Sequence, residues 1–343
     1  MIDRSLHADF LTYLRRVVGE GVEYRGPLRQ MTGGFVTDVY AFDLVGAPSE
    51  WAGPLVLRIY PDGTEPSSIR REQCAQEVVW AQGVPAPRVL ACEDTAGALG
   101  RPFMVMERLP GRAQMSIEFP GFLAEIPRLF TLGRRHAAAM RMVHVLDAEP
   151  LIEAFAAAGI DRRSAGPEHW LDGANATIDR WGFDGLRAAL EWLRANRPPD
   201  PERLSICHGD LFGANILERD GRVTGILDWN LVTVSDAAFD VGGQLAAYQM
   251  SPLPGPAPLR WIATGAGQLM ARDLQREYAK LHAIDPDVVR YYAVMRAFTE
   301  LTFKIGLQAE SRATGIVRRM PTWKPEQCAR YFRRRTDVSI DLE

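Results

Sequence analysis

The sequence predicts an α/β protein with two parts, a small antiparallel sheet followed by a larger, mainly helical region. Three observations carry this prediction. From about residue 25 to residue 60 the chain consists of short β-rich runs with turn signals, and two more strand-like runs follow before residue 109. After "LPG" at 109–111 the apolar residues take the spacing of helices instead. The chain has 343 residues, 47% of them hydrophobic, which is enough for one large core or two joined cores.

The composition excludes several classes of protein. Lys plus Arg number 40 against 43 Asp plus Glu, a net charge of -3, so there is no electrostatic footprint for nucleic acid. The four cysteines are scattered without a CxxC pair, which indicates reduced thiols and neither a zinc site nor a disulfide framework. The first 21 residues lack the apolar core of a signal peptide, and no run reaches transmembrane length. We therefore expect a cytoplasmic protein without a nucleic-acid or membrane partner. The sequence does not predict the oligomeric state.

The elements of the first part follow from short patterns. An amphipathic helix is expected at the N-terminus. The alternating run "VTDVYAFDL" and the run "PLVLRIY", which ends in the turn signal "PDG", predict an antiparallel hairpin. The stretch "SSIRREQCAQEVVWAQG" predicts a helix that ends at Gly83, and "RVLACED" and "RPFMVMERL" predict two more strands.

The second part is mainly helical. Residues 128–146 and 183–196 have helix periodicity and little β signal, and everything from about residue 261 onward again looks helical. Breaks rich in Pro and Gly, at "NRPPDPERL" and "SPLPGPAPLR", bracket an apolar stretch that contains conspicuous polar residues.

Those polar residues are the main functional signal. In "HGDLFGANIL", at 208–217, Asp210 and Asn215 are five residues apart, and "GILDWN" then places Asp228 after a strand. Buried carboxylates are costly to desolvate, so their presence here needs a reason. Asp and Asn oxygens are ligands that Mg²⁺ prefers, and phosphoryl transfer also uses a carboxylate that orients a hydroxyl and accepts its proton.

The order Asp-x4-Asn, strand, Asp matches the catalytic loop and metal loop of kinases. With Gly209 in place of the Arg of protein kinases and Asp228-Trp229-Asn230 as the second motif, the chain resembles the aminoglycoside phosphotransferase family, the small-molecule branch of the protein kinase-like fold. The resemblance implies a bilobal fold, with a nucleotide-binding N-lobe at 1–108 and a C-lobe at 109–343 whose catalytic segment is 204–241.

The resemblance also implies roles for individual residues. Asp210 is the expected catalytic base, and Asn215 and Asp228 are the expected magnesium ligands. Three further residues are expected to support the loops. His208 is expected to pack beneath the catalytic loop, and the acidic pair Asp236 and Asp240 is expected to brace the metal loop.

In the N-lobe, Gly33 and Gly34 stand at a strand end, where unhindered amides can approach phosphates, although two such glycines can equally form a plain turn. Arg58 in "LVLRIY" occupies the position at which the resemblance implies a lysine that binds the α- and β-phosphates. Arginine can bind them through its fork, although it is bulkier and not a neutral replacement. The alternative to phosphate binding is that Arg58 is an exposed strand residue without a ligand.

Two acids on the helix after Arg58 are candidate partners for it. At about 100° per residue, Glu72 flanks the apolar stripe of that helix whereas Glu77 points to water. We therefore expect Glu72 to pair with Arg58, with a solvated role as the alternative.

The resemblance further implies that "PFMVMERLPG" is the hinge that lines the purine slot, although an apolar core strand and a turn describe the same letters. The hinge residues are Met106, Glu107 and Leu109.

The sequence therefore predicts transfer of the γ-phosphoryl group of ATP or GTP, with Mg²⁺, to a hydroxyl of a small molecule. The resemblance places the acceptor on helices of 113–200 and 245–335. Residues 241–343 hold 15 Lys plus Arg against 10 Asp plus Glu, which favours a neutral or anionic acceptor over a polycation. Candidate acceptor residues, each of which can instead belong to the core, are Trp229, Asn230, Trp261, Tyr291 and Tyr292.

Three functions stay open. The acceptor can be an antibiotic, for resistance or self-protection. It can be a metabolite, such as an amine alcohol, a sugar or an amino-acid hydroxyl. The third alternative is a nucleotide-binding pseudokinase that acts as a scaffold, which Arg58 and the missing glycine after Asp228-Trp229 would allow.

Overall fold

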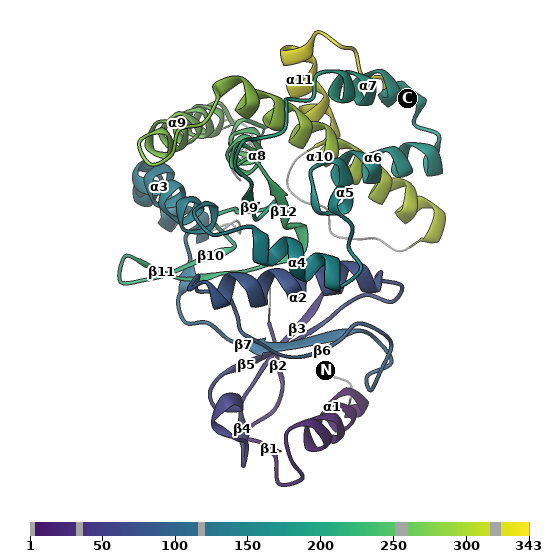
Figure 1. The fold of residues 1–343 in the computed structure, drawn as a ribbon, viewed down its shortest axis with the longest axis vertical. Coiled ribbons are helices and arrows are strands. Elements are labelled where there is room, and N and C mark those ends of the chain that lie inside the picture. Colours follow the sequence, from purple (N-terminus) through teal and green to yellow (C-terminus); the bar gives the residue numbers. More distant parts are fainter. Residues whose placement is uncertain (1–3, 32–36, 116–120, 251–259, 316–323, 343) are drawn as a thin grey trace. The chain divides into compact units, whose positions relative to one another are not determined.

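The computed structural model describes residues 4–31, 37–115, 121–250, 260–315 and 324–342. It divides into two compact units (Figure 1). Unit 1 comprises Met1–Arg112, Ala154–Ile160 and Leu217–Asn230, and unit 2 comprises Ala113–Glu153, Asp161–Ile216 and Leu231–Glu343. The α/β prediction is confirmed, because unit 1 contains a small antiparallel sheet and unit 2 is mainly helical.

Unit 1 is built on a five-stranded sheet in the order β2-β3-β5-β7-β6. Each pair of neighbouring strands is antiparallel. The predicted hairpin is the pair β3 and β5, and the two later predicted strands are β6 and β7. The bounds are β2 Arg29–Gln30, β3 Asp38–Phe42, β5 Leu55–Ile59, β6 Val89–Glu93 and β7 Phe103–Glu107.

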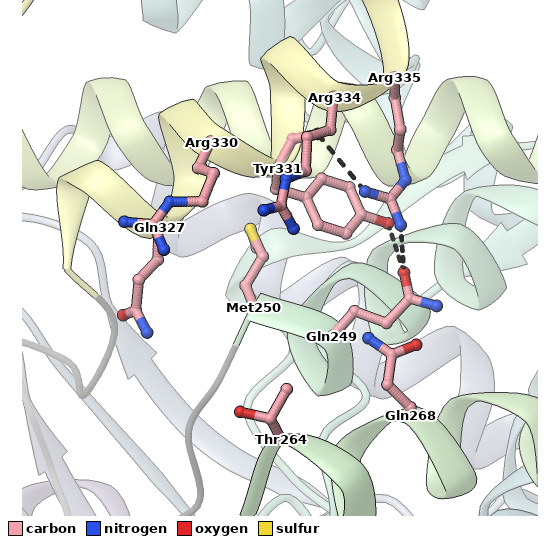
Figure 2. A pocket seen from close by; sticks show the side chains of 9 residues that line it. All are labelled: Gln249, Met250, Thr264, Gln268, Gln327, Arg330, Tyr331, Arg334 and Arg335. Carbon is pink, nitrogen blue, oxygen red and sulfur yellow. Dashed lines mark hydrogen bonds between the residues drawn. The ribbon is translucent and has the colours of Figure 1, made fainter. Parts of the chain in front are cut away.

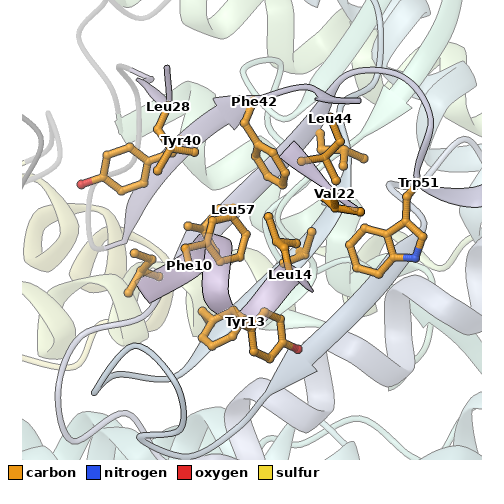
Figure 3. Close-up of a cluster of buried hydrophobic side chains, with 14 residues drawn as sticks. Phe10, Tyr13, Leu14, Val22, Leu28, Tyr40, Phe42, Leu44, Trp51 and Leu57 are labelled. Carbon is orange, nitrogen blue, oxygen red and sulfur yellow. The ribbon is translucent and has the colours of Figure 1, made fainter. Parts of the chain in front are cut away.

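One face of this sheet packs against the predicted N-terminal helix, α1 (Arg4–Val17). Phe10 of α1 meets Phe42 edge to face at 5.2 Å between ring centroids, and Tyr13 meets Phe103 in the same way at 4.8 Å. These rings belong to a buried apolar cluster that also includes Leu57 (Figure 3). The cluster fixes the sheet from one side.

The other face of the sheet packs against α2 (Pro66–Ala81), which begins with a proline at its first turn and ends before Gly83 at φ +90°. Successive strand side chains alternate between the two faces. In β7, Phe103 therefore faces the α1 cluster, whereas Met104 packs with Ile69 of α2. This alternation also puts Arg58 of β5 on the face that α2 covers.

The remaining elements of unit 1 are short. The strands β1 and β4 pair antiparallel, and β11 pairs with β10, whose first residue belongs to unit 2. The strand β8 stands where the chain first leaves unit 1. Their bounds are β1 Glu23–Tyr24, β4 Leu44–Val45, η1 Ser49–Trp51, β8 Arg112–Ala113, β10 Ile216–Arg219, β11 Arg222–Ile226 and η3 Trp229–Leu231.

Unit 2 is organised around the long helix α10 (Pro286–Thr314), which packs against α6, α8 and α11, while α3 packs against α9. At Gly242 of α8, an added Cβ would lie 2.5 Å from the carbonyl oxygen of Val289, so only glycine permits this approach of α8 to α10. The other helices are α3 Gly121–His144, α4 Glu149–Ala157, α5 Arg162–Ala165, α6 Glu168–Trp181, η2 Asp184–Leu186, α7 Arg187–Ala195, α8 Ala238–Met250, α9 Arg260–Ala279 and α11 Pro325–Thr336. The last four residues of α4 belong to unit 1.

A two-stranded antiparallel sheet in unit 2 positions the predicted catalytic stretch. Its strands are β9 (Ser205–Cys207) and β12 (Thr233–Ser235), paired with Cys207 opposite Thr233. The stretch at 208–215 follows β9 directly, so its backbone starts from a fixed, fully buried strand.

Two composition-based expectations are tested by the structure. All four cysteines are free thiols, which confirms the absence of a disulfide framework. Within the described part of the chain, no helix combines the length and the apolar character that crossing a membrane requires.

Candidate active site

The predicted site residues form two groups, one in each unit. The group in unit 1 is centred on Arg58, whose side chain is only 13% exposed. The guanidinium donates to Oε1 of Glu72 at 2.5 Å and to Oδ1 of Asp228 at 2.9 Å. Glu72 is fully buried and Glu77 is exposed, so the predicted ion pair and the choice between the two acids are confirmed.

The charges in this group support one another. Burial opposes the charge of Arg58, but Glu72 and then Asp228 outweigh it and raise the pKa of Arg58 above its usual value. Burial raises the pKa of Glu72, and Arg58 acts in the opposite direction. The hydroxyl of Tyr60 donates to Oε2 of Glu72 at 2.9 Å, so each carboxylate oxygen has a donor. The group is thus a preformed cluster of one guanidinium and two acids.

Asp228 holds an unusual backbone conformation for a residue other than glycine, with φ +67°. Such left-handed residues cost of order 1–2 kcal/mol and concentrate at functional sites. The next residue anchors the turn, because the indole Nε1 of Trp229 donates to the carbonyl oxygen of Ile226 at 2.9 Å. The carboxylate of Asp228 remains 39% exposed and can accept a further ligand.

The predicted hinge is the end of β7 and the residues after it. Met106 is buried, and Glu107 pairs with Nε of Arg88 at 3.0 Å. The backbone N–H groups of Glu107 and Arg108 donate to carbonyl oxygens at 3.0 and 2.9 Å, so neither is available to a purine. Leu109 packs on β11, where a Cβ added to Gly225 would lie 3.0 Å from Leu109 Cδ1. Gly33 and Gly34 lie outside the described residues.

In unit 2, the second residue of the predicted catalytic stretch, Gly209, has φ +82°. A Cβ at this position would also collide with the carbonyl oxygen of Leu231. Both the conformation and the space therefore require glycine, which gives Gly209 a structural reason in addition to the family pattern. His208 is fully buried, and its Nδ1 accepts a hydrogen bond from the backbone N–H of Asp210 at 3.2 Å, as expected of a supporting residue.

The carboxylate of Asp210 is held from two sides. Nδ2 of Asn215 donates to the backbone oxygen of Asp210 at 2.9 Å and to its Oδ2 at 3.3 Å. On the other side, the guanidinium of Arg296 donates to Oδ1 of Asp210 at 2.9 Å and also to the carbonyl oxygen of Gly209. Asp210 remains 35% exposed, so its orientation is fixed while part of the carboxylate is accessible.

Arg296, on α10, was not identified from the sequence. It is 10% exposed, pairs with Glu300 at 2.8 Å, and lies over the ring of Trp170 at 5.4 Å. Burial opposes its charge, but Glu300 and then Asp210 outweigh this and raise its pKa. No local motif marks Arg296, because its partner is 86 residues earlier in the chain.

Asp240, in the first turn of α8, braces the catalytic stretch. Its Oδ2 accepts the backbone N–H of His208 at 2.7 Å and its Oδ1 that of Gly209 at 2.8 Å. Nε2 of His144 lies 3.0 Å from the same carboxylate. Burial opposes the ionised form, but the bond from His144 and the other donors outweigh it and lower the pKa of Asp240.

The expected acidic pair is therefore divided. Asp240 holds the catalytic stretch, whereas the resemblance had indicated the metal loop. The carboxylate of Asp236 accepts the N–H of Ala238 at 2.7 Å, which is a cap at the start of α8. His144, Cys207 and Asp240 lie close enough together to hold a metal ion, but the existing hydrogen bonds of Asp240 account for its burial without one.

The acceptor candidates are mostly core residues, the alternative that the sequence left open. Trp229 is fully buried. Tyr291 donates to the carbonyl oxygen of Leu193 at 3.1 Å, and the hydroxyl of Tyr292 lies 3.0 Å from that of Ser235. Asn230 is exposed, and the side chain of Trp261 lies outside the described residues.

The sequence of this chain is similar to those of known phosphotransferases. A model of the phosphotransferase enzyme family matches residues 28–275. The aminoglycoside 3'-phosphotransferase of Streptomyces fradiae is 28% identical over 267 residues, which cover 76% of this chain and 90% of that protein.

A second kind of relative is larger. Acyl-CoA dehydrogenase family member 11 of Homo sapiens is 28% identical over 195 residues, 54% of this chain. The match spans only 24% of that protein's length.

Among solved structures, a ternary complex of the aminoglycoside phosphotransferase APH(4)-Ia with AMP-PNP and hygromycin B matches with a TM-score of 0.57. The match covers 96% of this chain and 98% of that one at 18% identity, which shows a shared fold. The predicted kinase-like bilobal fold is thus confirmed. Because the family model covers most of the chain, the chain belongs to the phosphotransferase enzyme family.

Proposed function

We propose that this phosphotransferase moves the γ-phosphoryl group of ATP or GTP to a hydroxyl group of a small molecule. The observation that carries the proposal is the setting of Asp210, which is oriented by Arg296 and Asn215 and remains accessible. A general base must be held within hydrogen-bond reach of the hydroxyl whose proton it accepts. Residues 1–108 and 109–343 are the proposed nucleotide-binding and acceptor-binding lobes.

In unit 1, we assign Arg58 to the phosphates of the nucleotide. Each terminal nitrogen of Arg58 donates one N–H to an acid, which keeps the side chain charged and fixed, and its second N–H is the proposed donor to phosphate. Met106, Glu107 and Leu109 are the proposed hinge. Since the N–H groups of Glu107 and Arg108 are already bonded, contacts to the purine would come from other backbone groups and from Leu109.

Asp228 and Asn215 are the proposed magnesium ligands, on the chemistry of their side-chain oxygens. Asp228 presents a partly exposed carboxylate, and Asn215 uses its amide nitrogen to bind Asp210, which leaves the amide oxygen as its metal-binding atom. Magnesium, when bound, would neutralise the charge that develops on the triphosphate. The role of Asp210 is to align the acceptor hydroxyl and take its proton as the phosphoryl group is transferred.

An antibiotic is the first candidate acceptor. The related enzyme from Streptomyces fradiae is named for an aminoglycoside, and the structurally similar enzyme binds hygromycin B. A hydroxyl-bearing metabolite is the second candidate. It is favoured by the relatives named for the acyl-CoA dehydrogenase family, a name from metabolism rather than from antibiotic resistance.

The test is a screen for transfer of one phosphoryl group, read by mass spectrometry, with ATP and GTP as donors. The acceptor panel holds aminoglycosides, macrolides, amine alcohols, sugars and hydroxy acids. Support is a product that carries one added phosphoryl group, formed by the wild type only with magnesium. Stabilisation by Mg·ATP without turnover of any acceptor would favour the pseudokinase alternative instead.

A further inference from the structure

We propose that a cavity bounded by α8, α9 and α11 binds an anionic group of the acceptor, a carboxylate or a phosphate ester. The cavity has a volume of about 220 Å³ and lies entirely within unit 2. Its lining consists of arginines, amide and hydroxyl side chains and one methionine (Figure 2). The assignment of the anion to the acceptor rests on the proposed function. The proposal that the cavity binds an anion does not depend on it.

The charge of the cavity is wholly positive. Arg330, Arg334 and Arg335 of α11 all line the cavity. Arg330 and Arg334, four residues apart, share a helix face, and Arg335 follows directly after Arg334. Among the described residues that line it, none is Asp or Glu. Within the part of the chain that the structure describes, no carboxylate forms an ion pair with any of the three. A cavity of this kind attracts an anion and repels an ammonium group.

Other arginines of unit 2 contrast with this cluster. A second cavity of unit 2 is also lined by arginines, but acids line it as well, and two of its arginines are paired with them: Arg163 with Asp172 at 2.9 Å and Arg197 with Glu168 at 2.6 Å. The cavity at α11 therefore differs from the second cavity because its described arginines have no acidic partners. The number of arginines does not distinguish the two cavities.

The donors of the cavity are held in place by a small network. Arg335 lies over the ring of Tyr331 at 3.5 Å, and both donate to Oε1 of Gln249, at 2.8 and 3.0 Å. Burial raises the pKa of Tyr331 to about 12, so its hydroxyl stays protonated at neutral pH. Because two donors occupy the oxygen of Gln249, its remaining polar group is an N–H donor as well (Figure 2).

The cavity is placed at a suitable distance for an acceptor that reaches the catalytic stretch. Asp240, at the start of α8, binds the backbone of that stretch, and the nine residues from Asp240 to Gln249 span about 14 Å of helix. Phe212, two residues after Asp210, lies beside Tyr248, with ring centroids 6.5 Å apart. An acceptor with its acidic group some 10–15 Å from its hydroxyl fits this separation.

Direct binding tests the anion site without any acceptor. Calorimetric titration with inorganic pyrophosphate, in the absence of magnesium, would start from the wild type, since any binding at Arg58 is then common to all the variants compared. Adding Arg330→Gln with Arg334→Gln should weaken binding by at least about tenfold, because charge-assisted bonds are lost. Arg333→Gln is the matched control, since Arg333 is an exposed arginine of the same helix outside the lining. Equal affinity in the double variant and in this control would overturn the site.

Acceptor kinetics test the second half of the proposal. With hydroxy acids or phosphate-bearing alcohols, the double variant should raise KM by at least about tenfold and leave kcat within about threefold, whereas neutral acceptors should be unaffected. Loss of pyrophosphate binding with an unchanged KM for acidic acceptors would overturn the link to the acceptor. If the wild type phosphorylates nothing, the proposed function fails, and the titration still decides whether the cavity binds anions.

Discussion

The ion pair between Arg58 and Glu72 leads to a prediction about stability that needs no acceptor. In Arg58→Met, the fully buried carboxylate of Glu72 loses a donor at 2.5 Å and keeps the hydroxyl of Tyr60 at 2.9 Å. Removing one partner of a buried ion pair costs about 3–5 kcal/mol. Because Tyr60 continues to satisfy one oxygen, we expect the lower part of that range.

The cost should depend on pH. Burial already raises the pKa of Glu72, so the folded protein binds this proton more strongly than the unfolded chain does. The contribution of Glu72 is therefore most favourable below its unfolded pKa, about 4.3, and declines as pH rises through the folded pKa. Loss of Arg58 raises that pKa further, so Arg58→Met should be destabilised more at about pH 7.5 than at about pH 5.

Urea unfolding followed by tryptophan fluorescence measures this cost. Arg101→Met is the matched control, because Arg101 forms a partly exposed pair with Asp38 at 2.6 Å, and such pairs contribute about 1 kcal/mol or less. In the double variant with Glu72→Gln, most of the loss and its pH dependence should disappear. The reasoning is refuted if Arg58→Met costs no more than the control, or if the double variant is no more stable than Arg58→Met alone.

Three further predictions concern the catalytic stretch. Gly209→Ala should lower the urea midpoint, because a left-handed alanine costs about 1–2 kcal/mol and its methyl group meets the Leu231 carbonyl oxygen; an unchanged midpoint would contradict this. Arg296→Gln should lower kcat about 10- to 100-fold, the equivalent of one charge-assisted bond to Asp210, and unchanged turnover in the folded variant would exclude this orienting role. Asp240→Asn should cost about 3 kcal/mol or more at neutral pH; since the pKa of Asp240 is lowered, this difference should shrink as pH falls below about 4, and a constant difference would count against the assignment.

Periodicity was sufficient for much of unit 1. The apolar stripe of α2 depends only on local spacing, and it selected Glu72 over Glu77, whereas the family resemblance supplied Arg58 as the partner. Periodicity did not predict which backbone groups of the hinge are free to bind a purine. Which N–H groups near Glu107 are already bonded depends on strand pairing across the sheet, and spacing within one strand carries no such information.

In unit 2, the sequence marked Asp210 and Asn215 but not the residue that fixes them from the other side. Arg296 comes from a helix 86 residues later, and one arginine among many carries no pattern. Asp240 was found, but its target was assigned to the other loop, because only the folded backbone shows that it accepts the N–H groups of His208 and Gly209. The cavity at α11 was indicated only as an excess of basic residues, since its lack of counter-ions depends on three helices meeting.

The central claim is that Asp210 accepts the proton of an acceptor hydroxyl during phosphoryl transfer. The most direct measurement is turnover of the acceptor found in the panel screen by Asp210→Asn, with Asp9→Asn, an exposed aspartate of α1, as the matched control. Asparagine preserves the shape of the side chain and can still accept from Arg296, so the fold should be retained. We predict that kcat falls by about 100-fold or more in Asp210→Asn and is unchanged in the control. Near-normal turnover in the purified Asp210→Asn protein would contradict the account.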